Sequence, residues 1–159
     1  MTRTCLPLRT CLLFLMLLSP AWPAQAGAVN GADVAEIRAV IQLQIDAFRR
    51  DDARGAFALA SPDVRQAFRT PEKFLDVVRF AYRAVYRPSA VAFRDVLVMG
   101  GDVVQPVQIT DRAGGAWVAY YSMQRQHDGS WKTNGCHLVQ PVRTIPAVNR
   151  IQPVRPIPA

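Results

Sequence analysis

The chain has 159 residues, half of them hydrophobic and 9% aromatic, with 19 basic against 12 acidic side chains and a net charge of +7. A chain of this length holds one small globular domain, and its apolar content excludes a disordered protein. It contains no run of about 20 apolar residues, the length that a membrane-spanning helix needs. Composition therefore favours a single folded domain with its own core.

The first 26 residues have the pattern of a secretory signal peptide. Arg3 and Arg9 precede an apolar run at residues 11–18, and small residues lead to Ala26. This order of a basic, an apolar and a small-residue region predicts cleavage after Ala26. We therefore expect an exported, soluble periplasmic protein that keeps no membrane anchor and carries a net charge of +5.

An amphipathic helix is predicted near the start of the domain. Asp33 and Glu36 have the spacing of a capping box, which satisfies backbone N–H groups at a helix start. Apolar residues then recur at steps of three and four, as on one helix face. They are Val34, Ile37, Ile41, Ile45 and Phe48. The helix is expected to end where Asp51 and Asp52 interrupt this pattern.

Further helical segments follow. Residues 53–60 form a short alanine-rich stretch, and Ser61 with Pro62 starts a turn at 63–68, because proline is tolerated at the first helical position. A third main helix starts at another such pair, Thr-Pro, and must stop before Pro88. Its apolar stripe consists of Phe74, Val77, Val78, Ala81 and Val85.

From residue 91 the apolar period changes to two, which is typical of half-buried strands. Four runs rich in Val, Ile, Tyr, Trp and Thr show it, at 91–99, 103–111, 116–126 and 131–140. The connections between these runs are so short that they allow only antiparallel neighbours. We therefore predict an α+β fold in which three N-terminal helices pack on one face of a curved four-stranded antiparallel meander.

Three regions are thus expected: a signal peptide at 1–26, a single domain at 27–140 and a tail at 141–159. The tail contains five prolines and three arginines without an acidic residue, a composition typical of extended or disordered segments. Because much of the basic excess lies in this tail, outside the domain, we expect no nucleic-acid partner.

Several short motifs resemble those of a known family. They are Gln44-x-x-Ala47-Phe48, Asp51-Asp52, Tyr86-Arg87-Pro88, Val103-Val104-Gln105 and Asp128-Gly129-Ser130-Trp131. Over residues 34–140 the chain resembles the exported bacterial proteins grouped as domain of unknown function 4864. Its order of elements is similar to the cone of the nuclear transport factor two-like (cystatin-like) superfamily, which includes ketosteroid isomerase, polyketide cyclases and non-enzymatic binding or dimerisation modules. The resemblance implies a fold and leaves the activity open.

In such a cone the concave sheet faces the long helices, and a pocket opens between them. Polar side chains at the borders of the apolar helix stripes, or on the inward side of the strands, are the candidates for its wall. They are Gln44, Tyr82, Gln105 and Tyr121. Each also has a structural interpretation, because buried polar groups usually satisfy a backbone group or a subunit contact.

Asp95 is the one candidate for a catalytic base. It shares its strand parity with apolar residues, and burial in a cone would raise the pKa of its carboxyl group toward useful proton transfer. With a tyrosine as hydrogen-bond donor, it would suit an isomerase or cyclase-like enzyme. In the alternative interpretation, a bulge near Arg94 turns the aspartate outward.

Cys136 is the only cysteine after the signal peptide and precedes His137. Adjacent residues of a strand point to opposite faces, so these two do not form a nucleophile and base pair. Cys136 is interpreted as a small buried hydrophobe or, alternatively, as a redox or dimer thiol. Two histidines without ligand spacing indicate no metal site, and no motif indicates a cofactor.

These observations favour a non-enzymatic module. It would bind a small hydrophobic molecule in the pocket, or a partner protein or second copy through the sheet. The isomerase with Asp95 is the alternative. A third interpretation fills the cone with aromatic side chains and leaves an exposed apolar sheet face for interaction or dimerisation.

Overall fold

The computed structural model describes residues 29–141. The predicted signal peptide, 1–26, and the predicted tail beyond Pro141 lie outside these residues. The helices are α1 (Gly31–Arg49), α2 (Ala53–Ala58), α3 (Pro62–Phe68), α4 (Pro71–Ala81) and α5 (Arg83–Tyr86), and the strands are β1 (Ala90–Phe93), β2 (Leu97–Met99), β3 (Asp102–Thr110), β4 (Ala116–Arg125) and β5 (Trp131–Val139). None of the helices between residues 29 and 141 has the length and hydropathy to span a membrane.

Helix α1 begins at Gly31, earlier than its predicted start after Asp33. The Asn30 side chain accepts hydrogen bonds from the backbone N–H groups of Ala32 and Asp33 at 2.8 and 3.0 Å, and the Asp33 carboxylate accepts one from Asn30 N–H at 3.0 Å. Asn30 and Asp33 therefore form the capping box, because an asparagine caps a helix as well as an aspartate. Glu36 instead accepts a hydrogen bond of 3.0 Å from the backbone N–H of Trp131.

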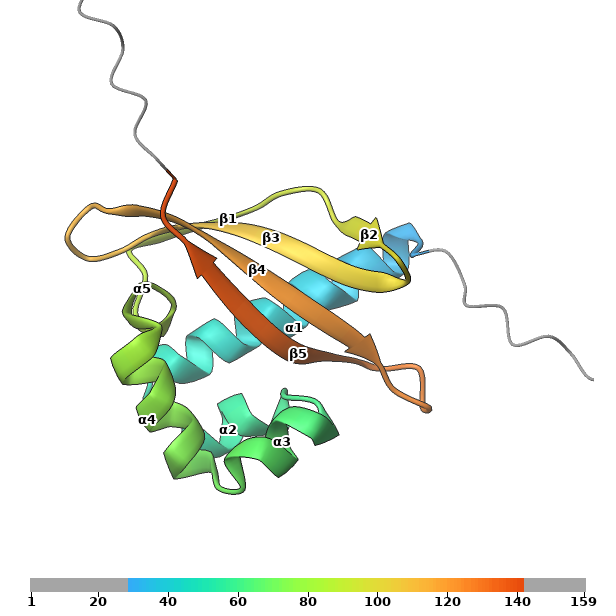
Figure 1. The fold of residues 1–159 in the computed structure, drawn as a ribbon, viewed down its shortest axis with the longest axis horizontal. Coiled ribbons are helices and arrows are strands. Elements are labelled where there is room, and N and C mark those ends of the chain that lie inside the picture. The colour runs from blue at the N-terminus through green and yellow to red at the C-terminus, as the bar shows by residue number, and fades with distance from the viewer. Residues whose placement is uncertain (1–28, 142–159) are drawn as a thin grey trace, which may run out of the picture.

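The strands form one antiparallel sheet in the order β1-β3-β4-β5, and β2 also pairs with β3. Figure 1 shows the helices on one side of this sheet, with α1 running along it. The predicted strand at 91–99 is divided into β1 and β2 by residues 94–96. The α+β fold, with helices on one face of a curved antiparallel sheet, is confirmed.

The edge strand β5 is partly covered by the segment that joins α2 to α3. The backbone N–H of Ser61 donates to the carbonyl of Thr133 at 2.9 Å, and the N–H of Thr133 donates to the carbonyl of Leu59 at 3.0 Å. These bonds satisfy groups that an open edge would leave unpaired. They also fix the start of α3 beside β5.

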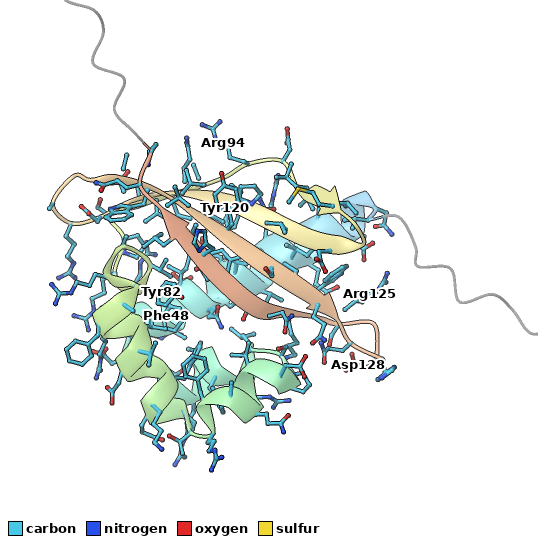
Figure 2. All side chains as sticks on the ribbon, viewed as in Figure 1. Phe48, Tyr82, Arg94, Tyr120, Arg125 and Asp128 are labelled. Carbon is cyan, nitrogen blue, oxygen red and sulfur yellow. The ribbon has the colours of Figure 1, made fainter. Side chains whose placement is uncertain are left out.

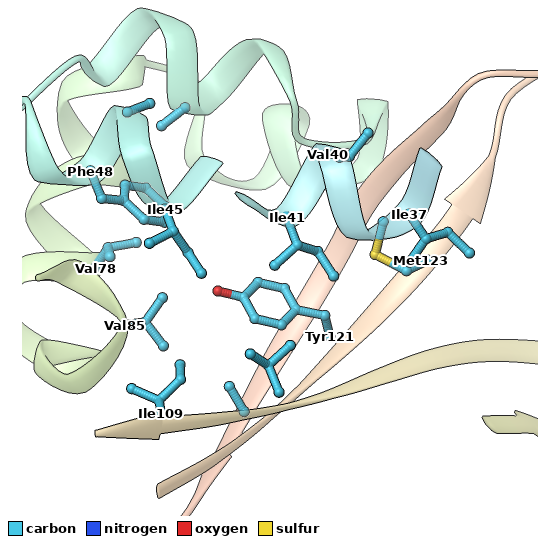
Figure 3. Packing of buried hydrophobic residues seen from close by; sticks show 14 of the residues in the cluster. Ile37, Val40, Ile41, Ile45, Phe48, Val78, Val85, Ile109, Tyr121 and Met123 are labelled. Carbon is cyan, nitrogen blue, oxygen red and sulfur yellow. The ribbon is translucent and has the colours of Figure 1, made fainter. Parts of the chain in front are cut away.

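The core lies between α1 and the concave face of the sheet. Ile37, Ile41 and Ile45 of α1 are fully buried. Tyr121 of β4 packs beneath them, and Figure 3 shows its ring crossing the space between α1 and the sheet. Burial of the apolar stripe of α1 follows directly from its period of three and four residues.

An aromatic cluster joins the shorter helices to α1. The ring of Phe74 in α4 stands at its centre. Its centroid lies 5.9 Å from that of Phe48, 5.6 Å from that of Phe57 and 5.2 Å from that of Phe68. These are ordinary distances for tilted and edge-on aromatic pairs. The cluster holds α2, α3 and α4 together at one end of the core.

The turn after α1 is held by Asp51, whose φ of 59° lies in the left-handed region. Its carboxylate accepts a hydrogen bond from Arg79 Nη2 at 2.9 Å, and others from the Tyr86 hydroxyl and the Arg87 guanidinium. The hydrogen bond from Tyr86, followed by that from Arg79, lowers the pKa of Asp51. This cluster ties the turn to α4 and α5.

Candidate functional site

A cavity of about 440 Å³ lies between the helices and the concave face of the sheet. Most of its wall comes from α1, α3, α4 and β5, and Tyr121 of β4 contributes to it. The lining residues are Gln44, Phe48, Asp63, Val64, Ala67, Phe68, Phe74, Val77, Val78, Tyr82, Val85, Tyr121, Thr133, Asn134, Gly135 and Cys136. The volume falls in the range of roughly 300–1,000 Å³ that is usual for sites of small molecules.

Three of the predicted residues lie in one row across the sheet. Gln105 of β3 is paired with Tyr121 of β4, and Tyr121 is paired with Cys136 of β5. Side chains opposite one another on antiparallel strands lie on the same face. The row therefore runs along the concave face. Tyr121 of β4 and Cys136 of β5 line the cavity.

Tyr121 is one of the most deeply buried polar residues of the wall. Its side chain is 2% exposed, and its hydroxyl has no hydrogen-bond partner among the described residues. Figure 3 shows the hydroxyl pointing past Ile41 toward Ile45, Val78 and Val85. Burial, with a smaller contribution from Cys136, raises the pKa of Tyr121 well above its ordinary value. The hydroxyl is therefore a neutral hydrogen-bond donor at any physiological pH.

Gln44 lines the cavity from α1, and its amide nitrogen is already engaged. Nε2 donates to the carbonyl of Ala56 at 3.0 Å and to Oγ1 of Thr133 at 2.9 Å. The Thr133 hydroxyl donates in turn to the carbonyl of Leu59 at 3.3 Å. Gln44 thus combines the predicted place in the pocket wall with the structural role that was the alternative.

Tyr82 lines the cavity at the junction of α4 and α5. It is half-buried, and its backbone N–H caps α4 by donating to the carbonyl of Val78 at 3.0 Å. Figure 2 shows Tyr82 and Phe48 in the space between α4 and the sheet. The end of the helix at this residue lets the side chain face the cavity rather than the solvent.

Gln105 is buried, but the structure places it outside the cavity wall. Its Nε2 donates to the carbonyl of Arg94 at 2.7 Å and to that of Pro106 at 2.8 Å. Nη2 of Arg38 also donates to the carbonyl of Arg94, at 3.1 Å. The amide of Gln105 thus holds the break between β1 and β2, which corrects the prediction of a pocket residue.

Asp95 lies in that break, between β1 and β2, and is exposed. It is not among the residues that line the cavity. Figure 2 shows its neighbour Arg94 projecting away from the helices. The inward position was predicted from the strand parity of Asp95, and the break at 94–96 removes that parity. The cavity therefore receives no carboxylate from this strand.

Cys136 contributes a thiol to the cavity wall and is half-buried. Burial raises the pKa of this thiol to about 12. A thiol that is almost wholly protonated at neutral pH is a weak nucleophile. In this state Cys136 acts as a small apolar surface of the wall, in line with the first of the two interpretations of this residue.

Part of the wall could not be found by alternation along the strand. The pairing of β4 with β5 shifts at Ser122 and Met123, which face Gly135 and Thr133 and leave Asn134 as an extra residue in β5. This bulge lets consecutive residues line the cavity, because it interrupts the alternation of faces. The glycine inside the predicted strand was the available signal, since such a glycine often marks a bulge.

The wall residues of α3 are also not predicted from the sequence. Val64, Ala67 and Phe68 line the cavity from this helix. The sequence predicts α3 as a turn of only six residues, too short for a stripe that would define its buried face. Its orientation comes from the Ser61 and Thr133 backbone contacts, which join segments 72 residues apart in the chain.

The wall carries very little charge. Among the lining residues, all of which belong to the described part of the chain, none is arginine, lysine or histidine, and Asp63 is the single carboxylate. Asp63 is exposed, so it lies at the rim of the cavity. The interior is therefore apolar, apart from the neutral groups of Gln44, Thr133, Tyr82 and Tyr121.

Helices over one face of an antiparallel sheet, with a mostly apolar cavity between them, define an α+β protein of cone-like architecture. The chain belongs to the family described as domain of unknown function (DUF4864), whose model matches residues 30–145. This confirms the resemblance predicted from the sequence motifs.

No curated protein shows significant similarity to the chain. Among solved structures, the chain is similar to a protein of unknown function with a cystatin-like fold from Nostoc punctiforme. The identity is 10% and the TM-score is 0.49, over 70% of this chain and 93% of that one.

Proposed function

We propose that the domain is a binding protein for a small, mostly apolar molecule held in the cavity between α1, α3, α4 and β5. The observation that carries this proposal is a cavity of about 440 Å³ whose wall is largely apolar and contains a buried hydroxyl without a partner. Binding sites for small molecules have this composition, with a few polar groups in an apolar wall.

The driving force would be burial of apolar surface. Phe48, Phe68 and Phe74 line one end of the cavity. Each 100 Å² of ligand surface removed from water contributes about 2.5 kcal/mol, from which the cost of fixing the ligand is subtracted. A ligand of roughly ten to twenty non-hydrogen atoms therefore has enough surface for micromolar affinity.

The interior of the cavity favours binding over proton transfer. A general base must lie within reach of the proton it removes, and Asp95, the predicted base, is exposed outside the wall. The Cys136 thiol, with a pKa of about 12, stays protonated. We therefore retain the binding module predicted from the sequence.

The same proposal places the protein outside the cytoplasm. The signal-peptide pattern of residues 1–26 supports export to the periplasm. An exported binding protein of this kind would meet its ligand in the periplasm or at its membranes. The alternative partner predicted from the sequence is a second copy or another protein bound to the sheet. Such a contact would not require the cavity.

Native mass spectrometry of the full chain, expressed with residues 1–26 and purified without detergent, tests the proposal. We expect a species heavier than the chain by roughly a few hundred daltons, whose extra mass is lost on collisional activation. A bare chain that also takes up no added N-phenyl-naphthylamine, an uncharged apolar probe, would contradict it. The mass of the chain itself reports whether residues 1–26 are removed.

A further inference from the structure

The wall of the cavity contains a fully buried hydroxyl without a hydrogen-bond partner. The Tyr121 hydroxyl is buried and has no partner among the described residues, whereas Gln44 Nε2 and the Thr133 hydroxyl are both engaged with protein groups. Oε1 of Gln105 also lacks a partner, but it lies outside the wall. Among the lining residues, Tyr121 thus carries the one fully buried side-chain group that lacks a partner in the described part of the chain.

A buried polar group without a partner is costly, and native proteins rarely keep one without a reason. The Tyr121 hydroxyl points among Ile45, Val78 and Val85, which offer it no acceptor. A phenylalanine would fill the same space without this cost. The buried position of the hydroxyl is explained if a ligand supplies an acceptor atom for its hydrogen bond.

The charge of the wall restricts what this acceptor can be. No lining residue is a base, and the only carboxylate, Asp63, is at the rim. A carboxylate or phosphate next to Tyr121 would be a buried charge without a counterion, which is strongly unfavourable. A protonated amine there would likewise be a buried charge without a counterion, because the tyrosine hydroxyl stays neutral and the one carboxylate of the wall lies at the rim.

We infer that the ligand is an uncharged, mostly apolar molecule with a carbonyl or ether oxygen at its buried end, and that this oxygen accepts a hydrogen bond from the Tyr121 hydroxyl. The inference rests on the proposed function and adds the chemical class and orientation of the ligand. The apolar remainder of the molecule lies against the aromatic end of the cavity formed by Phe48, Phe68 and Phe74.

Three probes of the same shape separate the contributions. Acetylnaphthalene has a carbonyl oxygen, ethylnaphthalene lacks it, and naphthoate replaces it with a charged carboxylate. Their affinities are measured by calorimetry for the full chain, for Tyr121→Phe and for Tyr120→Phe. The last variant is the matched control, because Tyr120 makes the same chemical change on the other face of β4, where its side chain is 36% exposed.

The ratio of the affinities of acetylnaphthalene and ethylnaphthalene cancels the general effect of hydrophobicity. We expect this ratio to fall by roughly three- to tenfold in Tyr121→Phe, the value of one net hydrogen bond, and to stay unchanged in Tyr120→Phe. Naphthoate should bind at least about tenfold more weakly than acetylnaphthalene at neutral pH.

Two results would overturn the inference alone: an unchanged ratio in Tyr121→Phe, or naphthoate binding as tightly as acetylnaphthalene. In either case ethylnaphthalene still binds, and the cavity remains a site for apolar molecules. If none of the three probes binds the unmodified chain, the proposed function itself is wrong. Thermal unfolding confirms that both variants are folded, and a substitution that only removes a hydroxyl leaves the packing of β4 in place.

Discussion

Nε2 of Gln44 donates a hydrogen bond of 2.9 Å to Oγ1 of Thr133, a residue 89 positions later in the chain. Both side chains are buried and both line the cavity. The bond joins α1 to the edge strand β5 at the place where the segment before α3 also pairs with β5. The wall of the cavity therefore depends on a polar contact between the two ends of the domain.

Replacement of Gln44 by alanine should lower the free energy of unfolding by about 1–3 kcal/mol, because the carbonyl of Ala56 and the Thr133 hydroxyl lose their donor inside the protein. Urea unfolding measures this loss. A double-mutant cycle with Thr133→Val should give a coupling of about 0.5–1.5 kcal/mol. Gln42→Ala, in the same helix but bonded to Asp46 near the surface, is the control and should cost less than about 0.5 kcal/mol.

Because the carboxylate of Asp33 is buried and hydrogen-bonded, we expect the free energy of unfolding to depend on pH in the acid range. Hydrogen bonds from the backbone N–H of Asn30 and then from the Trp131 indole lower the pKa of Asp33 below its usual 3.8. The carboxylate of the unfolded chain then binds a proton more readily than that of the folded protein. The stability contributed by ionised Asp33 is therefore complete above the pKa of the unfolded state and is lost as the pH falls through the pKa of the folded state.

Asp33→Asn should therefore destabilise the domain at neutral pH and reduce the fall of stability below pH 4. Denaturant unfolding at a series of pH values measures both effects. Asp95→Asn is the matched control, since that carboxylate is exposed. An acid limb of Asp33→Asn as steep as that of the unmodified chain would mean that other carboxylates account for the acid sensitivity.

The left-handed turn at Asp51 predicts an order of stability among variants. Asp51→Ala removes the acceptor of Arg79, Tyr86 and Arg87 and keeps a side chain at a φ of 59°. Asp51→Gly removes the same acceptor but relieves the backbone, since glycine adopts this region freely. Thermal unfolding should rank the unmodified chain first, Asp51→Gly second and Asp51→Ala third. If alanine proves at least as stable as glycine there, the backbone at this turn is not strained.

The thiol of Cys136 should react slowly in the folded protein. A pKa of about 12, against a usual 9, lowers the thiolate fraction at pH 8 by roughly a thousandfold. Alkylation by iodoacetamide, followed by mass spectrometry of the peptide that contains Cys136, measures the rate. We expect rapid modification in denaturant and very slow modification without it. Equal rates in both conditions would show that the thiol is not held in the wall as described.

The main architecture follows from periodicity. Apolar steps of three and four placed α1 correctly on its buried face, and the change to a period of two located the sheet and its antiparallel connections. The start of α1 differs from the prediction because Asp33 and Glu36 have the spacing of a capping box, whereas Asn30 and Asp33 form it. Asp33 and Glu36 both contact Trp131, in a strand almost a hundred residues away, and local spacing does not contain that information.

The cavity was predictable only in part. Gln44, Tyr82 and Tyr121 lie in its wall because each occupies a border or inward position in a regular element. Asp95 depends on the strand continuing through residues 94–96, where the chain instead breaks. Gln105 does face inward, as alternation along β3 predicts, but its amide is bonded to that break and it lies outside the wall. The wall residues from α3 and from the bulge at Asn134 depend on contacts between distant segments. Where the backbone is irregular, alternation along the strand therefore does not predict which side chains reach the cavity.

The central claim is that the cavity takes up a small apolar molecule, and one pair of variants tests it most directly. Ala67 of α3 and its neighbour Gln66 are both exposed, but only Ala67 lines the cavity, at its rim. Titration with N-phenyl-naphthylamine should show saturable binding to the unmodified chain and to Gln66→Phe. Ala67→Phe should weaken it by about tenfold or more, because the larger side chain would narrow the cavity at its rim. Equal binding to all three proteins, or no saturable binding to any, would contradict the claim.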